Sequence, residues 1–215
     1  MSTDGQPTPD IGWCLVIPVK LLHLAKSRLS PDPRKRSLLA LAFAADTVAA
    51  ALRAPSVVEV VVVTDDPTAA AVVRGLGAEV VPDEPDAGLN PALRHGADYA
   101  TARHPGCGVG ALSADLPALT SADLENALRR ASTSRIAVVP DVEGTGTTAY
   151  LVAAGGEFTP SFGRDSLRAH VEAGATSLAD DELPSLRRDV DTPADLESAV
   201  SLGVGPHTRA ALNSI

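Results

Sequence analysis

The chain has 215 residues, a formal net charge of −9 and 45% hydrophobic residues, of which few are aromatic (3% of the chain). This length suits one domain with a substantial core, and the many Ala, Val and Leu residues favour helices packed on a Val-rich parallel sheet. The acidic balance argues against binding to nucleic acid or to an anionic membrane, because both require a basic surface. No apolar run reaches the roughly 18 residues of a membrane span. The polar, Pro-rich start is also unlike a signal peptide, so we expect a cytoplasmic protein.

The first two thirds of the chain alternate between strand and helix patterns. Residues 13–19 form the continuous apolar run of a strand buried on both faces, and residues 34–53 carry the apolar face of a helix. Gly75 is expected to close a later helix, and Ser121 to cap another. Further strands are predicted at 57–63, 79–81 and 109–113, and further helices at 68–74, 90–103 and 121–130. This order predicts an α/β fold with a Rossmann-like, mostly parallel sheet.

The pattern changes after residue 136. Two short apolar runs, 136–139 and 149–153, flank a segment rich in glycine and threonine, which predicts a substrate-binding flap or a small β insert. Residues 186–190 then predict a return to the parallel sheet. Thr192, followed by Pro193, is typical of the start of a helix.

The two ends of the chain are expected to be less ordered. Residues 1–10 are predicted to form a disordered tail before a single domain at 11–215. Residues 203–215 are expected to pack only loosely.

Three aspartates lie at the ends of predicted strands, at what would be the carboxyl edge of the sheet. Asp115 follows one of these strands, and Asp189 and Asp191 lie two residues apart at the end of the strand predicted at 186–190, on the same side of it. Open α/β sheets bind ligands at this edge, and carboxylate oxygens suit Mg²⁺ held together with substrate phosphates. Each aspartate alone also fits a turn or a cap. Together they predict a Mg²⁺ site, whereas the position of Asp195 at a helix start favours a structural role.

Three cations lie just after the first predicted strand, where a Rossmann-type protein carries a glycine-rich phosphate loop. They are Lys20, Lys26 and Arg28, and the G-x-G-x-x-G pattern is absent. Lys and Arg side chains can neutralise a triphosphate in place of backbone amides, and Arg offers a planar bidentate fork. The alternative is a solvated basic loop, which the position beside the strand edge makes less favourable.

Glycines and hydroxyl groups form two further candidate sites. In the segment 144–148, freed amides and threonine hydroxyls can surround a phosphate or a carboxylate, although a plain hairpin turn also fits. Ser166 lies just before a predicted helix, where it either caps the helix or donates to an anion. Asn90 either caps the helix after Gly88 or reads a base edge. The role of His170 stays open.

At these motifs the chain resembles the 2-phospho-L-lactate guanylyltransferase family. It resembles most closely the actinobacterial branch, the phosphoenolpyruvate guanylyltransferases of deazaflavin coenzyme F-420 biosynthesis. The resemblance spans nearly the whole chain, and the motifs come in the same order. They are Val19-Lys20, 25–29 (Ala-Lys-Ser-Arg-Leu), 88–90 (Gly-Leu-Asn), 115–119 (Asp-Leu-Pro-Ala-Leu), 144–147 (Gly-Thr-Gly-Thr), 162–166 (Phe-Gly-Arg-Asp-Ser), 189–196 and 202–206.

The resemblance implies a single-domain GT-A-like nucleotidyltransferase fold that joins GTP to a phosphorylated three-carbon acid and releases pyrophosphate. It also implies hand-off of the reactive product to a downstream phospholactate-type transferase. The residues it implies are Asp115, Asp189 and Asp191 for Mg²⁺, and Lys20, Lys26, Arg28 and Asn90 for the nucleotide.

For phosphoenolpyruvate, the resemblance implies Gly163, Ser166 and one threonine of the glycine- and threonine-rich segment. Thr147 and Thr148 are adjacent, so the register is ambiguous. Thr148 is favoured because it directly precedes the apolar run.

Several alternatives remain. The acceptor could be 2-phospho-L-lactate or 3-phosphoglycerate, or the transferred group could come from another nucleotide. A sugar-phosphate nucleotidyltransferase is related by fold, but the short region at 144–166 argues for a small acceptor. A non-catalytic, nucleotide-binding regulatory protein is a different class, and the presence of three carboxylates together with the cationic loop argues against it.

Overall fold

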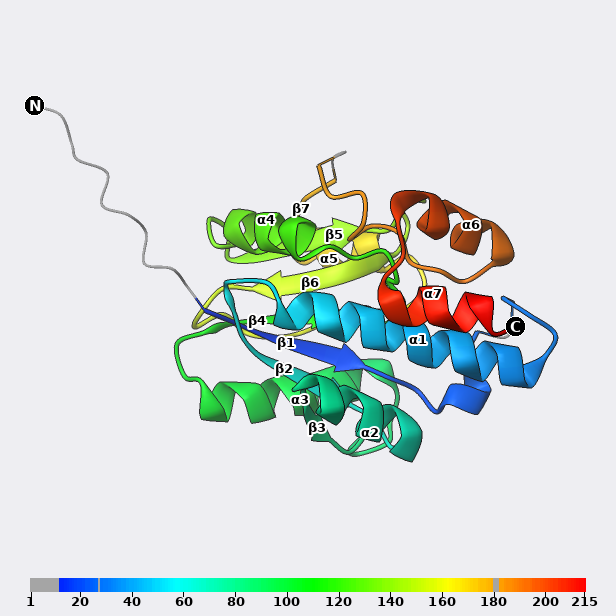
Figure 1. Cartoon of the computed structure of the whole chain (residues 1–215). Helices are drawn as coiled ribbons and strands as arrows, with labels where there is room; N and C mark the ends of the chain where they lie inside the picture. The colour runs from blue at the N-terminus through cyan, green and yellow to red at the C-terminus, as the bar shows by residue number, and fades with distance from the viewer. Residues whose placement is uncertain (1–11, 27, 180–181) are drawn as a thin grey trace, which may run out of the picture.

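A seven-stranded sheet forms the centre of the computed structural model, which describes residues 12–26, 28–179 and 182–215 (Figure 1). Its strands are β1 (Trp13–Pro18), β2 (Val57–Val63), β3 (Glu79–Val81), β4 (Gly108–Leu112), β5 (Ile136–Pro140), β6 (Thr147–Val152) and β7 (Thr176–Ser177). They lie in the order β3-β2-β1-β4-β6-β5-β7, and only β6 is antiparallel to its neighbours. The predicted α/β fold with a mostly parallel sheet is confirmed.

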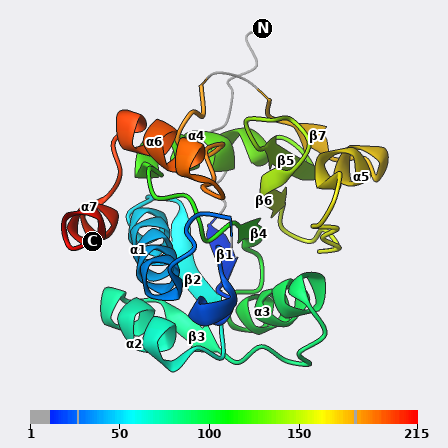
Figure 2. The same cartoon turned by 90° about the vertical axis from the view of Figure 1, so that its right-hand side faces the viewer.

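Helices cover both faces of this sheet, as Figure 2 shows. On one face lie α1 (Pro33–Leu52), α2 (Pro67–Leu76) and α4 (Ser121–Ala131), and on the other α3 (Leu89–Arg103) and α5 (Ser166–Glu172). Strand alternation explains the two buried faces. In β1, Trp13, Leu15 and Ile17 pack in the core beneath α1, α2 and α4, whereas the alternate residues pack beneath α3.

Two helix caps differ from the residues that the sequence predicted. α2 is closed by Gly77 rather than Gly75, because Gly77 adopts the left-handed conformation (φ 106°) that closes the helix. The N-cap of α4 is Thr120, whose hydroxyl accepts a backbone N–H of the first turn, and Ser121 is the first helical residue.

The glycine- and threonine-rich segment joins β5 and β6 as a hairpin. The small β insert is therefore confirmed, but it belongs to the main sheet, since β6 pairs with β4 as well as with β5. The strand predicted at 186–190 is wrong. Leu183 and Leu186 are both fully buried, three residues apart, and the N–H of Leu186 donates to the carbonyl of Leu183 (3.2 Å). That spacing belongs to a turn and not to the two-residue period of a strand.

The last two helices are α6 (Pro193–Leu202) and α7 (Pro206–Asn213). The prediction that residues 203–215 pack loosely is wrong, because α7 packs against α1. Asp46 of α1 is 4% exposed and accepts hydrogen bonds from the backbone N–H groups of His207 (3.0 Å) and Thr208 (2.8 Å). A side chain in α1 therefore caps α7.

Two further predictions concern the N-terminal tail and the membrane. The tail predicted at residues 1–10 lies outside the described residues. Among the helices that the structure describes, none combines the length and the hydropathy needed to cross a membrane.

Candidate active site

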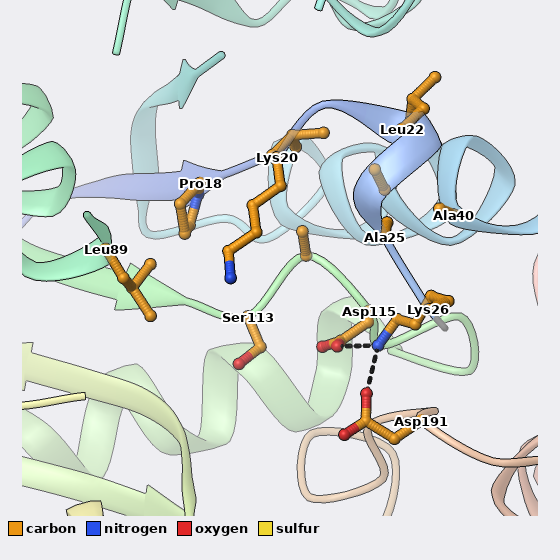
Figure 3. Close-up of a pocket in the computed structure, with 13 residues that line it drawn as sticks. Pro18, Lys20, Leu22, Ala25, Lys26, Ala40, Leu89, Ser113, Asp115 and Asp191 are labelled. Carbon is orange, nitrogen blue, oxygen red and sulfur yellow. Dashed lines mark hydrogen bonds and ion pairs between the residues drawn. The ribbon is translucent and has the colours of Figure 1, made fainter. Parts of the chain in front are cut away.

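A cleft opens where β1, β2, β3 and β4 end, the edge at which open α/β sheets bind ligands. Its first arm, a cavity of about 300 Å³, lies between the loop after β1, α1 and the loop after β4 (Figure 3). Its second arm, of about 270 Å³, extends past the ends of β2 and β3 to the start of α3. The two arms share Pro18, Val19, Lys20 and Leu89, so they form one continuous cleft.

The three predicted aspartates lie near one another, and Asp115 and Asp191 line the first arm, although not in the way the sequence suggested. Asp115 lies just after β4, as predicted, but Asp189 and Asp191 lie in the loop before α6 and not at a strand end. The N–H of Val190 donates to the carbonyl of Asp115 (3.1 Å) and holds this loop against the end of β4. This backbone hydrogen bond therefore brings Asp189 and Asp191 close to Asp115, although no strand forms at 186–190.

Asp195 fixes the position of Asp191. Thr192 and Asp195 form a reciprocal capping box at the start of α6, and the Asp195 carboxylate also accepts from the N–H of Asp191 (3.2 Å). Burial acts to raise the pKa of Asp195, but the hydrogen bonds from Thr192 and Asp191 outweigh it and lower the pKa. The predicted structural role of Asp195 is confirmed.

Lys26 lies among these carboxylates. Its ammonium group forms ion pairs with Asp115 and with Asp191 (2.8 Å to the latter), and its side chain is 9% exposed (Figure 3). Burial acts to lower the pKa of Lys26, but the two carboxylates outweigh it and raise the pKa. Lys26 also has a left-handed backbone (φ 56°), a costly conformation for a residue other than glycine. Arg28, by contrast, is 71% exposed and pairs with Asp191 from the solvent side.

Lys26 and Arg28 do not fully offset the negative charge of the carboxylate cluster at Asp189. Burial, together with the neighbouring Asp115 and Asp191, raises the pKa of Asp189 to about 7, although Lys26 acts in the opposite direction. In the described part of the chain these side chains do not form a ready-made set of three metal ligands, because the Lys26 ammonium lies between two of them. The hard carboxylate donors and the raised pKa of Asp189 nevertheless fit a divalent cation such as Mg²⁺.

The cationic loop is anchored by a residue whose role the sequence pattern did not indicate. Asp66 caps α2 and also accepts from the N–H of Leu22 (3.0 Å) in the short 3₁₀ helix Leu22–Leu24 between Lys20 and Lys26. Burial acts to raise the pKa of Asp66, but the three backbone donors outweigh it and lower the pKa. Lys20 itself is exposed and extends into the cavity between Pro18 and Ser113 (Figure 3).

A pair of hydroxyl groups lies at the start of β6. Because β6 is antiparallel to β4, its first residue lies at the same sheet edge as Asp115. Thr147 Oγ1 and Ser166 Oγ are 3.1 Å apart, whereas the hydroxyl of Thr148 donates to the carbonyl of Val139 (3.3 Å). The structure thus pairs Ser166 with Thr147, and not with Thr148, which the sequence favoured.

A break in strand register explains this choice of threonine. Val139 of β5 lies opposite Ala149, but the next residue, Pro140, lies opposite Thr147, so Thr148 is an extra residue in β6. Such bulges redirect a side chain and are common next to active sites. Here the bulge turns Thr147 toward α5.

The loop before α5 carries the two other residues predicted to bind the acid. Gly163 has a positive φ of 143°, which side chains strongly disfavour, and Ser166 is the first residue of α5 rather than its cap. Asn90 does not cap α3. Its amide instead donates to the carbonyl of Phe162 (2.9 Å) and accepts from the N–H of Phe162 (2.8 Å). Within the described residues, one amide N–H of Asn90 has no partner and is left for the predicted nucleotide contact.

The second arm contains carboxylates that the sequence analysis did not single out, namely Asp65, Asp83 and Asp86. The N–H of Asp83 donates to Asp65 (3.1 Å), while Oδ1 of Asp83 is buried and accepts no hydrogen bond within the described residues. Burial and the two neighbouring carboxylates raise the pKa of Asp83. Because Asp83 lines the second arm, its carboxylate suits a ligand that donates N–H groups.

Fold and site together define an α/β nucleotidyltransferase of the GT-A-like class. A nucleotidyl transferase from Methanothermobacter has the same fold, with a TM-score of 0.62 and 18% identity over 89% of this chain and 97% of that one. Residues 13–215 match the family described as guanylyl transferase CofC like, and the chain belongs to this family. A phosphoenolpyruvate guanylyltransferase from Thermomonospora curvata is 54% identical over 98% of this chain and 92% of its own length.

A further solved structure of the same fold comes from Mycobacterium tuberculosis. It is 20% identical to this chain, has a TM-score of 0.51 over 89% of this chain and 98% of its own, and is described as a complex with manganese.

Proposed function

We propose that this protein transfers the guanylyl group of GTP to phosphoenolpyruvate, forming enolpyruvoyl-2-diphospho-5′-guanosine and pyrophosphate in coenzyme F-420 biosynthesis. The observation that carries the proposal is the arrangement at one sheet edge of a cation-lined cleft, a carboxylate cluster and a separate hydroxyl pair. The relative that bears the name of this activity, at 54% identity, supports it.

The two arms of the cleft suit the two ends of GTP. Lys20, Lys26 and Arg28 would neutralise the triphosphate in the first arm. Guanine would lie in the second arm, where Asp83 would accept hydrogen bonds from its N1–H and its 2-amino group. Adenine has no N1–H and no 2-amino group, so it would not offer these two donors to the Asp83 carboxylate in the second arm.

Thr147, Gly163 and Ser166 would hold the acid through two hydroxyls and the backbone. A phosphate oxygen of the acid would attack the α-phosphorus of GTP, and the bond between the α-phosphate and the departing pyrophosphate would break. No general base is required, because the attacking phosphate is already ionised near neutral pH. The protein would contribute alignment of two anions and stabilisation of the charge on the departing group.

Asp115, Asp189 and Asp191 would hold Mg²⁺, which would supply positive charge against the repulsion between the two substrates. The manganese in the related Mycobacterium tuberculosis structure is in keeping with a divalent cation in this fold. Lys26 would exchange partners during loading. Released from Asp115 and Asp191, its ammonium group would pair with the phosphates of GTP.

The test is pyrophosphate release from GTP and Mg²⁺ with phosphoenolpyruvate, 2-phospho-L-lactate or 3-phosphoglycerate, with a downstream phospholactate-type transferase present to consume a labile product. The best acid is then repeated with ATP, CTP, UTP and ITP. We expect turnover with GTP and phosphoenolpyruvate, and slower turnover with ITP because inosine lacks the 2-amino group.

Asp115→Asn is expected to lose turnover by on the order of 1,000-fold while keeping its fold. The matched control Asp98→Asn removes the same charge from an exposed position on α3 and is expected to keep full activity. Turnover with another acid would reassign the acceptor. Folded protein that binds GTP but turns over no acid would instead favour a regulatory nucleotide-binding protein, and would also remove any hand-off of product to the downstream transferase.

A further inference from the structure

His170 of α5 is a buried histidine to which the reaction above gives no role. It is 1% exposed and stacks beside two aromatic rings, with its centroid 4.7 Å from that of Tyr150 and 5.3 Å from that of Phe162. Both ring nitrogens nevertheless have polar partners. Nδ1 lies 3.1 Å from Thr147 Oγ1, and Nε2 lies 2.9 Å from the backbone nitrogen of Ser161.

These two contacts fix which nitrogen carries the proton. The backbone N–H of Ser161 can only donate, so Nε2 must offer a lone pair. Burial lowers the pKa of His170 to about 4, so the ring is neutral and holds one proton near neutral pH. That proton must then be on Nδ1, from which it points at Thr147 Oγ1.

The tautomer decides what the hydroxyl pair can do. Thr147 and Ser166 have two hydroxyl protons between them, and one is used in the hydrogen bond that joins them (3.1 Å). Since Thr147 accepts from His170, the second hydroxyl proton stays available, and no other group in the described part of the chain accepts it. With the opposite tautomer, Thr147 would donate to His170, Ser166 would donate to Thr147, and no hydroxyl proton would remain.

We propose that His170 is a positioning residue for the acid substrate: through its Nδ1–H it makes Thr147 and Ser166 a hydrogen-bond donor toward an oxygen anion. This inference rests on the proposed function for the identity of the anion, a carboxylate or phosphate oxygen of phosphoenolpyruvate. His170 acts through a hydrogen bond and not through charge. Its bond to Ser161 also ties the loop that carries Gly163 to the same ring.

Kinetics separate this role from simple packing. His170→Phe keeps an aromatic ring beside Tyr150 and Phe162 but removes both hydrogen bonds, so we expect the KM for phosphoenolpyruvate to rise about 10-fold, the effect of one hydrogen bond to a charged group. The KM for GTP is expected to stay within about 2-fold. His170→Asn keeps an N–H donor near the place of Nδ1 and should restore part of the loss. In a Thr147→Val background, His170→Phe should add little, because the hydroxyl it orients is gone.

Two further measurements distinguish this inference from the proposed reaction. In wild-type protein labelled with ¹⁵N-histidine, NMR should show the His170 proton on Nδ1, whether or not catalysis occurs. Phosphoenolpyruvate should then be titrated, without GTP and in the presence of Mg²⁺, into the wild type and into His170→Phe. Its binding should be about 10-fold weaker in the variant.

A proton on Nε2, a charged ring, or unchanged acid binding in both variants overturns the inference. Failure of the wild type to bind phosphoenolpyruvate does so as well. If the acid binds in a His170-dependent way but no pyrophosphate is released with GTP, the inference holds and the proposed reaction is wrong.

Discussion

Asp189 is predicted to destabilise the protein when no metal is bound. Its pKa is raised from an ordinary 3.8 to about 7 by burial and by Asp115 and Asp191. Between pH 4 and pH 7 the folded protein therefore binds more protons than the unfolded chain. Stability falls as pH rises through this window, and the full penalty is present by pH 8. Asp189→Asn keeps the shape of the side chain and removes the charge, so it should stabilise the metal-free protein at pH 8.

The magnitude follows from the size of the pKa shift. A rise from 3.8 to about 7 corresponds to about 4 kcal/mol at 1.36 kcal/mol for each pKa unit. Asp189 is only partly buried, so hydration reduces this limit, and we expect about 2 kcal/mol. For a chain of this length, that gain raises Tm by about 6 °C.

The assay is thermal unfolding in EDTA at pH values from about 4 to 8, with Asp98→Asn as the matched control. The Tm difference between Asp189→Asn and wild type should grow from near zero at pH 4 to its full value at pH 8, whereas the control should show none. Mg²⁺ at pH 8 should then stabilise the wild type more than the variant. A variant less stable than wild type at pH 8, or a difference independent of pH, would refute the electrostatic reasoning.

Two further predictions test the C-terminal helix and the acid site. Asp46→Ala should cost about 3 kcal/mol in urea unfolding, because it removes the cap of α7 and leaves the N–H of Thr208 buried and unpaired; a cost below about 1 kcal/mol would show that α7 does not depend on this cap. Thr147→Val should raise the KM for phosphoenolpyruvate about 10-fold, whereas Thr148→Val should leave it within about 2-fold in the same steady-state assay. The reverse order would restore the sequence-based assignment of Thr148.

The strands and helices of the first two thirds of the chain could be predicted because their hydrophobic residues form clear patterns. The helices have an apolar face, and the strands are mainly apolar runs. Residues 13–19 are apolar throughout, as a strand buried on both faces must be, and residues 57–63 are apolar except for Glu59. The region at 186–190 misled because only Leu186 and Val190 are apolar there, and two apolar residues among charged ones fit a strand end and a buried turn equally well. Its true conformation depends on where Leu183 and Leu186 reach the core, which is a property of the tertiary structure.

Within the candidate site, residue types were easier to predict than pairings. Charge and position along the chain were enough to group Asp115 with Lys26, because both follow strands that end at the same edge. The choice of Thr147 over Thr148 depends on a bulge, and nothing in a run of adjacent threonines shows which one a bulge will turn toward α5. His170 could not be assigned from the sequence for a related reason: its partners are a backbone N–H and a hydroxyl, neither of which leaves a spacing motif.

Each loop of the candidate site is held by a polar side chain that lies at the start of a helix. Asp66 caps α2 and also holds the cationic loop, while Asp195 completes a capping box and also holds Asp191. Asn90 lies in the first turn of α3 and holds the loop around Gly163 through Phe162. These anchors connect the rigid sheet and helices to loops that would otherwise leave backbone groups unpaired. Catalysis by alignment requires that rigidity, since groups that only position two anions contribute little unless they are themselves fixed.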